Sequence, residues 1–350
     1  MISSIAASLV FALLAPFGSA LSTPTGSIAP GEPPKVGAPS WAVYDETSDV
    51  YLATWNMNDR RPMASVTKVM TAMVVLDEAE LDEIVTVPDF ATNSRGSVAG
   101  LVAGEQWSVY DLLVAMMVRS GNDAALTLAW HVGDGSVDAF VELMNAKAQQ
   151  LAMSDTHFVN PNGLDHEDHY STANDLTTMT LASLEYPVLQ DIARIRTIKM
   201  PEDPTGKVRH VNNTNRLLGA YPGVVGLKTG DTPYANKVLL GITERGSRRI
   251  VTVVMGTDDH FRDTRELVEW AYTTDGLRDR WLRPFFSEQG GGALPAVQID
   301  LSESEERRLA AMPRLDDGRW RMTPVSDLPK AASIGEWLKD ILPEIAGGER

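Results

Sequence analysis

Ser65 and Lys68 are one helical turn apart in the stretch "ASVTKVMT" at residues 64–71. Side chains at positions i and i+3 share one face of a helix, so the Lys68 amine is placed to take the proton of the Ser65 hydroxyl. A free lysine has a pKa of about 10.4 and is a poor base at neutral pH. Burial or a nearby cation would lower that pKa and free the lone pair. The pair predicts nucleophilic catalysis without a histidine, although about 0.6 Ser-x-x-Lys matches arise by chance in a chain with nine lysines.

Two further strings strengthen this prediction. "RSGNDAA" places residues 120–122 in the turn between two predicted helices, and "LKTGDT" places residues 228–230 on a predicted strand. Each tripeptide is expected by chance in about one chain in ten or twenty of this length. The occurrence of all three strings in this order, at wide intervals, is rarer still.

The elements that must position these residues follow from the hydrophobic periodicity. Strands are predicted over residues 40–56 around a polar turn, over 224–230, and over 236–256 with a hairpin turn near 244–247. Helices are predicted from near residue 65 and over about 108–118, 123–131, 137–151, 171–184 and 263–272. Strands at both ends and helices between them indicate an α+β fold: an antiparallel sheet built from both ends of the domain, flanked by helices, with an inserted all-helical lobe.

With these strings in place, the sequence resembles the penicillin-binding transpeptidase-like superfamily, which includes the class A β-lactamases. It is most similar to the low-molecular-weight, peptidase S11-like serine D-alanyl-D-alanine carboxypeptidases. The resemblance covers roughly residues 39–274 and extends to "FVELMNAKAQQLAMSDTHFVNPNGL", "HYSTANDL" and "IVTVVMG". The resemblance implies a β-lactamase/transpeptidase-like fold, which is consistent with the α+β layout that the periodicity indicates.

The resemblance implies a role for each motif side chain. Ser65 would attack a carbonyl carbon and form an acyl-enzyme, and Lys68 would accept its proton. Ser120 would pass a proton to the departing amine, with electrostatic help from Lys228. Asn122 would hold the amide of the substrate.

The same resemblance implies how the substrate is bound. Thr229 would meet its terminal carboxylate, and the backbone N–H groups of Ser65 and Asp231 would form the oxyanion hole. Gly230, which lacks a Cβ, would let the substrate lie against the strand edge. Arg262, in "HFRDTREL", stands where the family often has an arginine near the carboxylate pocket.

The segment after the third motif departs from the family pattern. "PYANKVLL" stands where the family usually continues with Ala-Gly and a small or apolar residue, so Asn236 and Lys237 replace small residues. Asp231 also brings a carboxylate to a pocket for an anionic substrate. We expect these departures to affect substrate preference or rate. They remove no motif side chain.

Composition limits the function classes. The 350 residues are 43% hydrophobic, carry a formal net charge of −16 and include no cysteine. The negative charge argues against a nucleic-acid partner and against broad attraction to an anionic membrane. Without cysteine, disulfides, thiolate metal sites and cysteine nucleophiles are excluded. His166 and His169 in "DHEDHY" lack a third ligand and a scaffold, so no metal and no cofactor are expected.

The two ends of the chain lie outside the catalytic pattern. Residues 1–22 have the apolar run and small residues of a secretory signal or an N-terminal anchor, and 23–38 are rich in Pro, Gly and Ser, as in a flexible linker. We assign 39–285 to the catalytic domain and 286–350 to a C-terminal region of unknown role.

An amphipathic stretch lies within this C-terminal region. Ile334, Trp337, Leu338 and Ile341 fall on one helical face. The opposite face is mixed and acidic, which favours packing on protein over contact with a membrane surface.

Together these features predict an extracytoplasmic serine carboxypeptidase. It would remove the terminal D-Ala from peptidoglycan stem pentapeptides, and penicillins, which mimic the D-Ala-D-Ala amide, would acylate Ser65. An endopeptidase acting on cross-links shares every motif, so the sequence leaves that preference open.

Two alternatives belong to other function classes. Class A β-lactamases usually show Ser-Asp-Asn and use a glutamate for deacylation, whereas this chain has Ser-Gly-Asn and no glutamate in "MSDTHFVNPNGL". A non-catalytic cell-wall-binding homologue is disfavoured by the complete motif set and favoured only by the unusual segment after Asp231.

Overall fold

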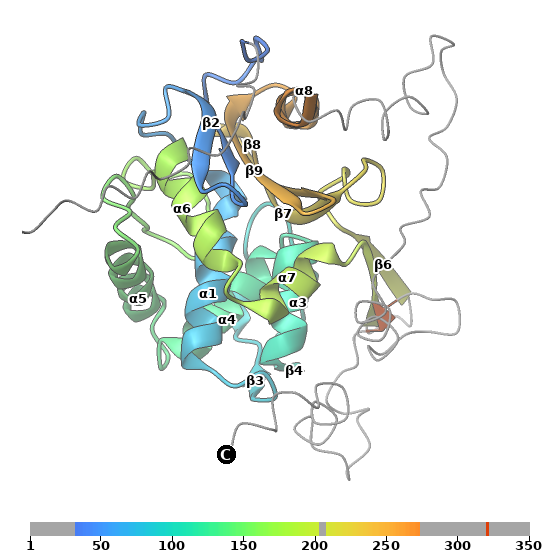
Figure 1. Cartoon of the computed structure of the whole chain (residues 1–350). Coiled ribbons are helices and arrows are strands. Elements are labelled where there is room, and N and C mark those ends of the chain that lie inside the picture. Colours follow the sequence, from blue (N-terminus) through green and yellow to red (C-terminus); the bar gives the residue numbers. More distant parts are fainter. Residues whose placement is uncertain (1–31, 203–207, 274–319, 322–350) are drawn as a thin grey trace, which may run out of the picture.

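The computed structural model describes residues 32–202, 208–273 and 320–321 (Figure 1). The predicted signal or anchor at residues 1–22 and the amphipathic C-terminal stretch lie outside the described residues. Among the helices that are described, none is both long enough and apolar enough to cross a membrane.

A five-stranded antiparallel sheet joins the two ends of the domain, in the strand order β2-β1-β9-β8-β7. The strands are β1 (Ser40–Asp45), β2 (Val50–Trp55), β7 (Val224–Thr232), β8 (Asn236–Arg245) and β9 (Arg248–Thr257). Because β1 pairs with β9 along its whole length, segments from opposite ends of the domain lie side by side (Figure 1). β7, which carries the third motif, is an edge strand of this sheet.

The chain between β2 and β7 forms the helical lobe. Its helices are the 3-10 turn η1 (Ala64–Val66), α1 (Thr67–Glu78), α2 (Asp89–Thr92), α3 (Val109–Val118), α4 (Asn122–Val132), α5 (Val137–Gln150), α6 (Ala173–Ser183) and α7 (Pro187–Arg194). The α+β architecture with an inserted helical lobe, predicted from the sequence, is confirmed.

The sheet has a hydrophobic core on each face, because successive side chains of a strand point to opposite sides. On β8, Val238 and Leu240 face the helical lobe, whereas Leu239 faces α8 (His260–Tyr272). Leu267 and Val268 of α8 are fully buried against this second face.

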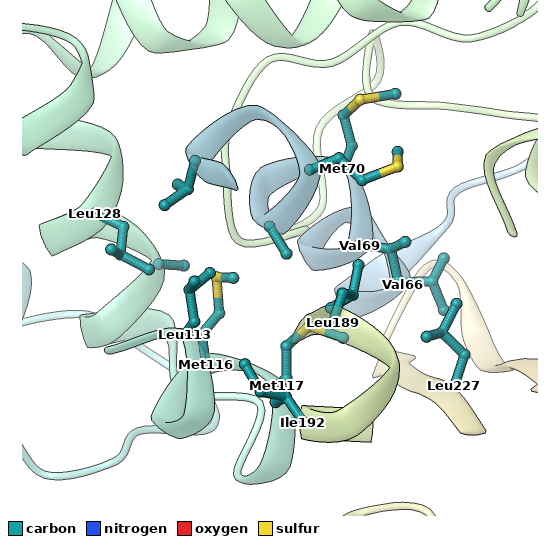
Figure 2. Close-up of a cluster of buried hydrophobic side chains, with 14 of the residues drawn as sticks. Val66, Val69, Met70, Leu113, Met116, Met117, Leu128, Leu189, Ile192 and Leu227 are labelled. Carbon is teal, nitrogen blue, oxygen red and sulfur yellow. The ribbon is translucent and has the colours of Figure 1, made fainter. Parts of the chain in front are cut away.

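Helix α1 lies at the centre of the larger core. Figure 2 shows Val66, Val69 and Met70 surrounded by side chains of α3, α4, α7 and β7. The residues that it labels in that shell are Leu113, Met116, Met117, Leu128, Leu189, Ile192 and Leu227. A helix packed closely against several neighbours is held rigidly, and α1 continues directly from the turn that contains Ser65.

Side-chain caps fix the starts of several helices. The Ser108 hydroxyl accepts from the Asp111 N–H at the start of α3, and the Thr172 hydroxyl accepts from the Asp175 N–H at the start of α6. α8 begins three residues earlier than predicted, because Asp259 caps it by accepting from the Arg262 N–H.

Periodicity missed the short elements. Helix α7 begins at Pro187, and two antiparallel pairs lie outside the main sheet. These are β3 (Ile84–Thr86) with β4 (Gln106–Ser108), and β5 (Thr197–Glu202) with β6 (Val208–Asn212); β10 (Trp320–Arg321) pairs with β5 in parallel. Strands of three residues are too short to show an alternating pattern.

Candidate active site

The turn that presents Ser65 is held between two glycines. Ala64 has φ +51°, a left-handed conformation that costs an L residue about 1–2 kcal/mol. A Cβ on Gly163 would lie 2.0 Å from the Ala64 carbonyl oxygen, and a Cβ on Gly230 would lie 3.1 Å from the Ser65 nitrogen. The nucleophile turn therefore fits only because both neighbours lack a side chain.

Thr67 and His169 fix the same turn from behind. The Thr67 hydroxyl donates to the Ala64 carbonyl at 2.7 Å, and His169 Nε2 lies 2.8 Å from that hydroxyl oxygen. His169 Nδ1 accepts from the Val159 N–H at 3.1 Å, so Nε2 carries the proton and donates to Thr67. Burial lowers the pKa of His169 to about 3, which keeps this arrangement neutral. His169 thus supports the nucleophile turn through Thr67, a role that the sequence did not indicate.

Lys68 is completely buried beside Ser65. Its Nζ lies 2.9 Å from Ser65 Oγ, 2.7 Å from Asn122 Oδ1 and 2.5 Å from the Asn162 carbonyl oxygen. Burial, and then the charge of Lys228, lower the pKa of Lys68 well below its usual range. A neutral amine has two N–H groups and one lone pair. The two carbonyl oxygens match the N–H groups, and the lone pair is left for the Ser65 hydroxyl.

Asn122, the first residue of α4, has a defined amide orientation. Its Nδ2 donates to the Arg95 carbonyl at 2.5 Å, so its Oδ1 faces Lys68. Ser120, two residues before Asn122, has a left-handed backbone conformation, φ +63°, and is 4% exposed. Within the described ranges the Ser120 hydroxyl makes no hydrogen bond, so it is available to a bound molecule.

The turn that carries Ser120 and Asn122 is anchored by the next residue, Asp123. This buried carboxylate accepts from the Ala124 N–H of its own helix at 3.0 Å. It also accepts from three backbone N–H groups of a separate segment, those of Ala99, Gly100 and Leu101, at 2.8, 2.7 and 3.0 Å. A carboxylate that caps three backbone donors holds both segments in place.

Lys228 supplies a second buried amine. It is 1% exposed, and its Nζ donates to the Thr229 carbonyl at 3.1 Å. Burial lowers the pKa of Lys228 to about 7. Because its charge also lowers the pKa of Lys68, the two lysines influence each other across the site.

The rest of the third motif lies on the edge strand β7. The Thr229 hydroxyl donates to the Thr214 hydroxyl at 2.7 Å, and Gly230 lies against the Ser65 turn. Asp231 is exposed, and its backbone pairs with Lys237 of β8.

The unusual segment after Asp231 forms an ordered turn. Asp165 accepts from the Thr232 hydroxyl at 2.6 Å and from the Tyr234 N–H at 3.2 Å. Asn236 has φ +53°, which asparagine adopts more readily than most residues, and its side chain donates to Asp258 at 2.9 Å. The Lys237 amine donates to the Asp258 carbonyl at 2.8 Å. These contacts explain how the turn accommodates Asn236 and Lys237 where the family usually has small residues.

Within the described residues, the Arg262 guanidinium makes no hydrogen bond or ion pair with the other predicted site residues. It is half exposed and pairs with Asp263 on its own helix at 2.9 Å, with Glu266 at 4.0 Å. Within the described part of the chain, Arg262 makes these two ion pairs and no other.

No metal site accompanies the lysines in the described segments. Among residues 32–202, 208–273 and 320–321, no group of three or more His, Asp or Glu side chains could hold a metal ion. His166 has its Nδ1 accepting from the Asp168 N–H, and both ring nitrogens of His169 are engaged.

Sequence reasoning missed four residues that complete the site: Asn162, Thr67, His169 and Thr214. Asn162 acts through its backbone carbonyl, which no residue type signals. It nevertheless lies in the string "NPNGL", and His169 lies in "HYSTANDL", both of which were part of the resemblance.

Comparison with known proteins identifies relatives of this chain. The family model of peptidase S11, D-alanyl-D-alanine carboxypeptidase, matches residues 28–259. The chain is 34% identical over 257 residues to the D-alanyl-D-alanine carboxypeptidase DacB2 of Mycobacterium tuberculosis, covering 71% of this chain and 86% of that protein. It is 35% identical over 267 residues to a D-alanyl-D-alanine endopeptidase of Pseudomonas aeruginosa, covering 71% and 84%. The structure of the Streptomyces K15 DD-transpeptidase matches with a TM-score of 0.65 and 28% identity, covering 69% and 99%.

Substitution of Gly163 by alanine tests the close packing of the nucleophile turn. The new Cβ would meet the Ala64 carbonyl at 2.0 Å in a residue with φ +81°. We expect Gly163→Ala to lower the free energy of unfolding by about 2–4 kcal/mol in urea denaturation. Gly104→Ala is the matched control, because Gly104 has φ +82° and nothing within 4 Å of its Cβ position. Equal losses in the two variants would show that backbone strain alone is responsible.

Replacement of Lys228 by methionine tests the cost of burying an amine. Its pKa of about 7 in the folded protein lies below the unfolded value, so the unfolded chain binds more protons between about pH 7 and 10.5. The free energy of unfolding of the wild type therefore rises between about pH 7 and 10.5 as the Lys228 amine becomes neutral. Below about pH 7 the amine is charged, and the full cost of burying that charge applies. Lys228→Met should raise the melting temperature at pH 6 and less so at pH 10, whereas exposed Lys35→Met should not. A lower melting temperature at pH 6 would contradict this account.

Proposed function

This chain belongs to the peptidase S11 family of D-alanyl-D-alanine carboxypeptidases, and on that basis we propose that it acts as an exported carboxypeptidase on peptidoglycan. It removes the terminal D-Ala from stem pentapeptides through an acyl-enzyme on Ser65. The observation that carries the proposal is the buried Lys68 amine at 2.9 Å from the Ser65 hydroxyl.

Acylation begins when Ser65 Oγ bonds to the carbonyl carbon of the penultimate D-Ala and its proton moves to Lys68 Nζ. The developing oxyanion is stabilised by the backbone N–H groups of Ser65 and Asp231. The peptide C–N bond then breaks, and the departing amine takes a proton through Ser120. The charge of Lys228 favours the polarised Ser120 hydroxyl in this step.

Deacylation uses the same groups in reverse. Water adds to the ester carbonyl, its proton passes to a lysine–serine pair, and the bond to Ser65 Oγ breaks to restore the hydroxyl. Asn122 holds the substrate amide, and Gly230 leaves room for the substrate along the edge of β7. Penicillins acylate Ser65 in the same way and act as covalent inhibitors.

The domain limits belong to the same proposal. We assign residues 39–285 to the catalytic domain and 286–350 to a separate C-terminal region, with 1–22 as a signal or anchor. The main sheet and α8 lie between Ser40 and Tyr272, and the family model matches residues 28–259. Both observations support a catalytic domain within residues 39–285. The signal-like composition of the first residues supports a location outside the cytoplasm.

Two related activities differ from this proposal in substrate. The endopeptidase of Pseudomonas aeruginosa has as high an identity as the carboxypeptidases, so D-Ala release should be compared on a pentapeptide and on a cross-linked dimer. A class A β-lactamase would present a glutamate for deacylation. Lys68 instead bonds to Ser65, Asn122 and the Asn162 carbonyl, and hydrogen-bonds to no carboxylate within the described residues.

Labelling of the purified full chain with a fluorescent penicillin tests the nucleophile and its base. Stable label on the wild type, none on Ser65→Ala, and labelling slowed by orders of magnitude on a folded Lys68→Ala are expected. Ser154→Ala, an exposed serine, should label like the wild type. Normal labelling of Lys68→Ala would refute the base assignment, and label that disappears within seconds would indicate a β-lactamase.

The pH dependence of acylation tests the two lysines together. The rate should rise with pH as Lys68 becomes neutral, since only the neutral amine accepts a proton. It should fall above about pH 7 as Lys228 loses its charge. Lys228→Arg keeps the charge at every pH in this range, so its falling limb should move to higher pH even if its maximum is lower. An unchanged falling limb would exclude Lys228 as its origin.

A further inference from the structure

Tyr234 is a large aromatic residue that the fold leaves in solvent. It lies in the turn between β7 and β8 and is 75% exposed. A single exposed aromatic residue is ordinary on a protein surface. Tyr234 is distinguished by its place near the nucleophile and by the order of its turn.

Two paths along the chain place Tyr234 near Ser65. Tyr234 follows Gly230 of β7 by four residues, and a Cβ on Gly230 would lie 3.1 Å from the Ser65 nitrogen. The Tyr234 N–H also donates to Asp165 at 3.2 Å. Asp165 follows Gly163 by two residues, and a Cβ on Gly163 would lie 2.9 Å from the same nitrogen. Since an extended chain spans at most about 3.6 Å per residue, both paths keep the Tyr234 backbone within about 20 Å of the nucleophile.

The turn holds the Tyr234 backbone in place although the side chain buries little. Asp165 accepts from the Thr232 hydroxyl at 2.6 Å as well as from the Tyr234 N–H. The Thr232 hydroxyl oxygen in turn accepts from the N–H of Ala235, which is buried, at 3.2 Å. Pro233 restricts the backbone immediately before Tyr234. A tyrosine on a fixed backbone has only two rotatable bonds, so it loses little conformational entropy when a ligand covers it.

The direction of the substrate follows from the proposed roles of the β7 residues. Its terminal carboxylate lies toward Thr229 and its reacting carbonyl at the Asp231 N–H, so the residues before that carbonyl continue toward Tyr234. Among the described strands, none pairs with the other edge of β7, so this path is open. In a stem pentapeptide, three residues and a lactyl group separate the reacting carbonyl from the sugar that carries the stem. That span is roughly 15 Å when extended, which brings the sugar to Tyr234.

The charges near Tyr234 favour a neutral ligand. Asp231 is exposed, and the carboxylates of Asp165 and Asp258 accept hydrogen bonds from the turn. The Lys237 amine is engaged by the Asp258 carbonyl. These carboxylates would repel an anionic group. An N-acetylated sugar whose lactyl group is bound in an amide is uncharged, and the C–H groups on one face of its ring can stack on an aromatic side chain.

We propose that Tyr234 binds the muramyl sugar of a glycan-linked stem by stacking on its ring, so that the enzyme prefers stems on glycan to free peptides. The inference rests on the proposed function, since it concerns the far end of the same substrate. Tyr234 is then a specificity residue and takes no part in the chemistry at Ser65. Because the contact exists in the bound substrate and in the transition state alike, it lowers KM and leaves kcat unchanged.

The experiment compares kcat/KM for D-Ala release by the full chain from two substrates that differ in the sugar alone. One is a disaccharide pentapeptide, and the other is the same pentapeptide with a D-lactyl group at its N-terminus. The wild type should favour the sugar-linked substrate by about 3- to 10-fold, mainly through KM.

Three variants of Tyr234 separate stacking from other contacts. Tyr234→Ala should remove the preference by lowering kcat/KM on the sugar-linked substrate to its value on the lactyl peptide. Tyr234→Phe keeps the ring and should behave like the wild type. Tyr234→Leu keeps apolar bulk without a flat face and should behave like Tyr234→Ala. Trp55→Ala is the matched control and should change neither substrate, because Trp55 is an aromatic residue, 57% exposed, on β2 at the opposite edge of the sheet.

Other results overturn the proposal. Equal kcat/KM of the wild type on the two substrates, or a preference that survives in Tyr234→Ala, would exclude Tyr234 as the sugar contact. Equal loss on both substrates in Tyr234→Ala would assign the contact to the peptide. A full preference in Tyr234→Leu would replace stacking by general apolar contact.

Failure of the proposed function gives a different result. If the wild type takes the penicillin label but releases no D-Ala from either substrate, the carboxypeptidase proposal fails. The slowing of labelling by the two peptides then decides the role of Tyr234 in the same variants. A wild type that neither releases D-Ala nor takes the label overturns both proposals.

Discussion

The desolvation of Lys68 is the constraint on which the rest of this structure depends. An amine serves as a base at neutral pH only if its charged form is made unfavourable, and burial does this most strongly. Burial requires a closed shell, and the central position of α1 provides it, with apolar side chains from three helices and β7 around it. The few polar atoms that face Lys68 must then match the neutral amine, as Asn122 Oδ1 and the Asn162 carbonyl do.

This constraint spreads through the fold because each partner of Lys68 has its own support. Asn122 is oriented by the Arg95 carbonyl, and its turn is held by Asp123. The Ser65 turn lies between Gly163 and Gly230, which come from the lobe and from the sheet. The site is therefore a junction of two structural units, and its geometry depends on how closely they approach each other.

Much of this could be predicted from sequence because the catalytic side chains are of unusual type and stand in recognisable strings. Ser65, Lys68, Asn122 and Lys228 are named by their motifs, and capping pairs such as Thr172 with Asp175 mark helix starts. Asn162 could not be identified, since a backbone carbonyl acts whatever side chain accompanies it. Thr214 was missed because its importance comes from β7, which no local pattern reveals. Arg262 was assigned by position in a string, but its neighbour Asp263 competes for it.

The pairing of β1 with β9 also determines when this protein can assemble. β1 is among the first strands to be synthesised, but its partner on one side is completed only at Thr257, after the entire helical lobe. Contacts between segments so distant in sequence form slowly, because a long loop must close before they do. The sheet therefore cannot close on a partial chain, and the nascent polypeptide stays open until β7, β8 and β9 have emerged. Such delayed closure would suit the export that we propose, in which the chain crosses a membrane before its lysines are buried.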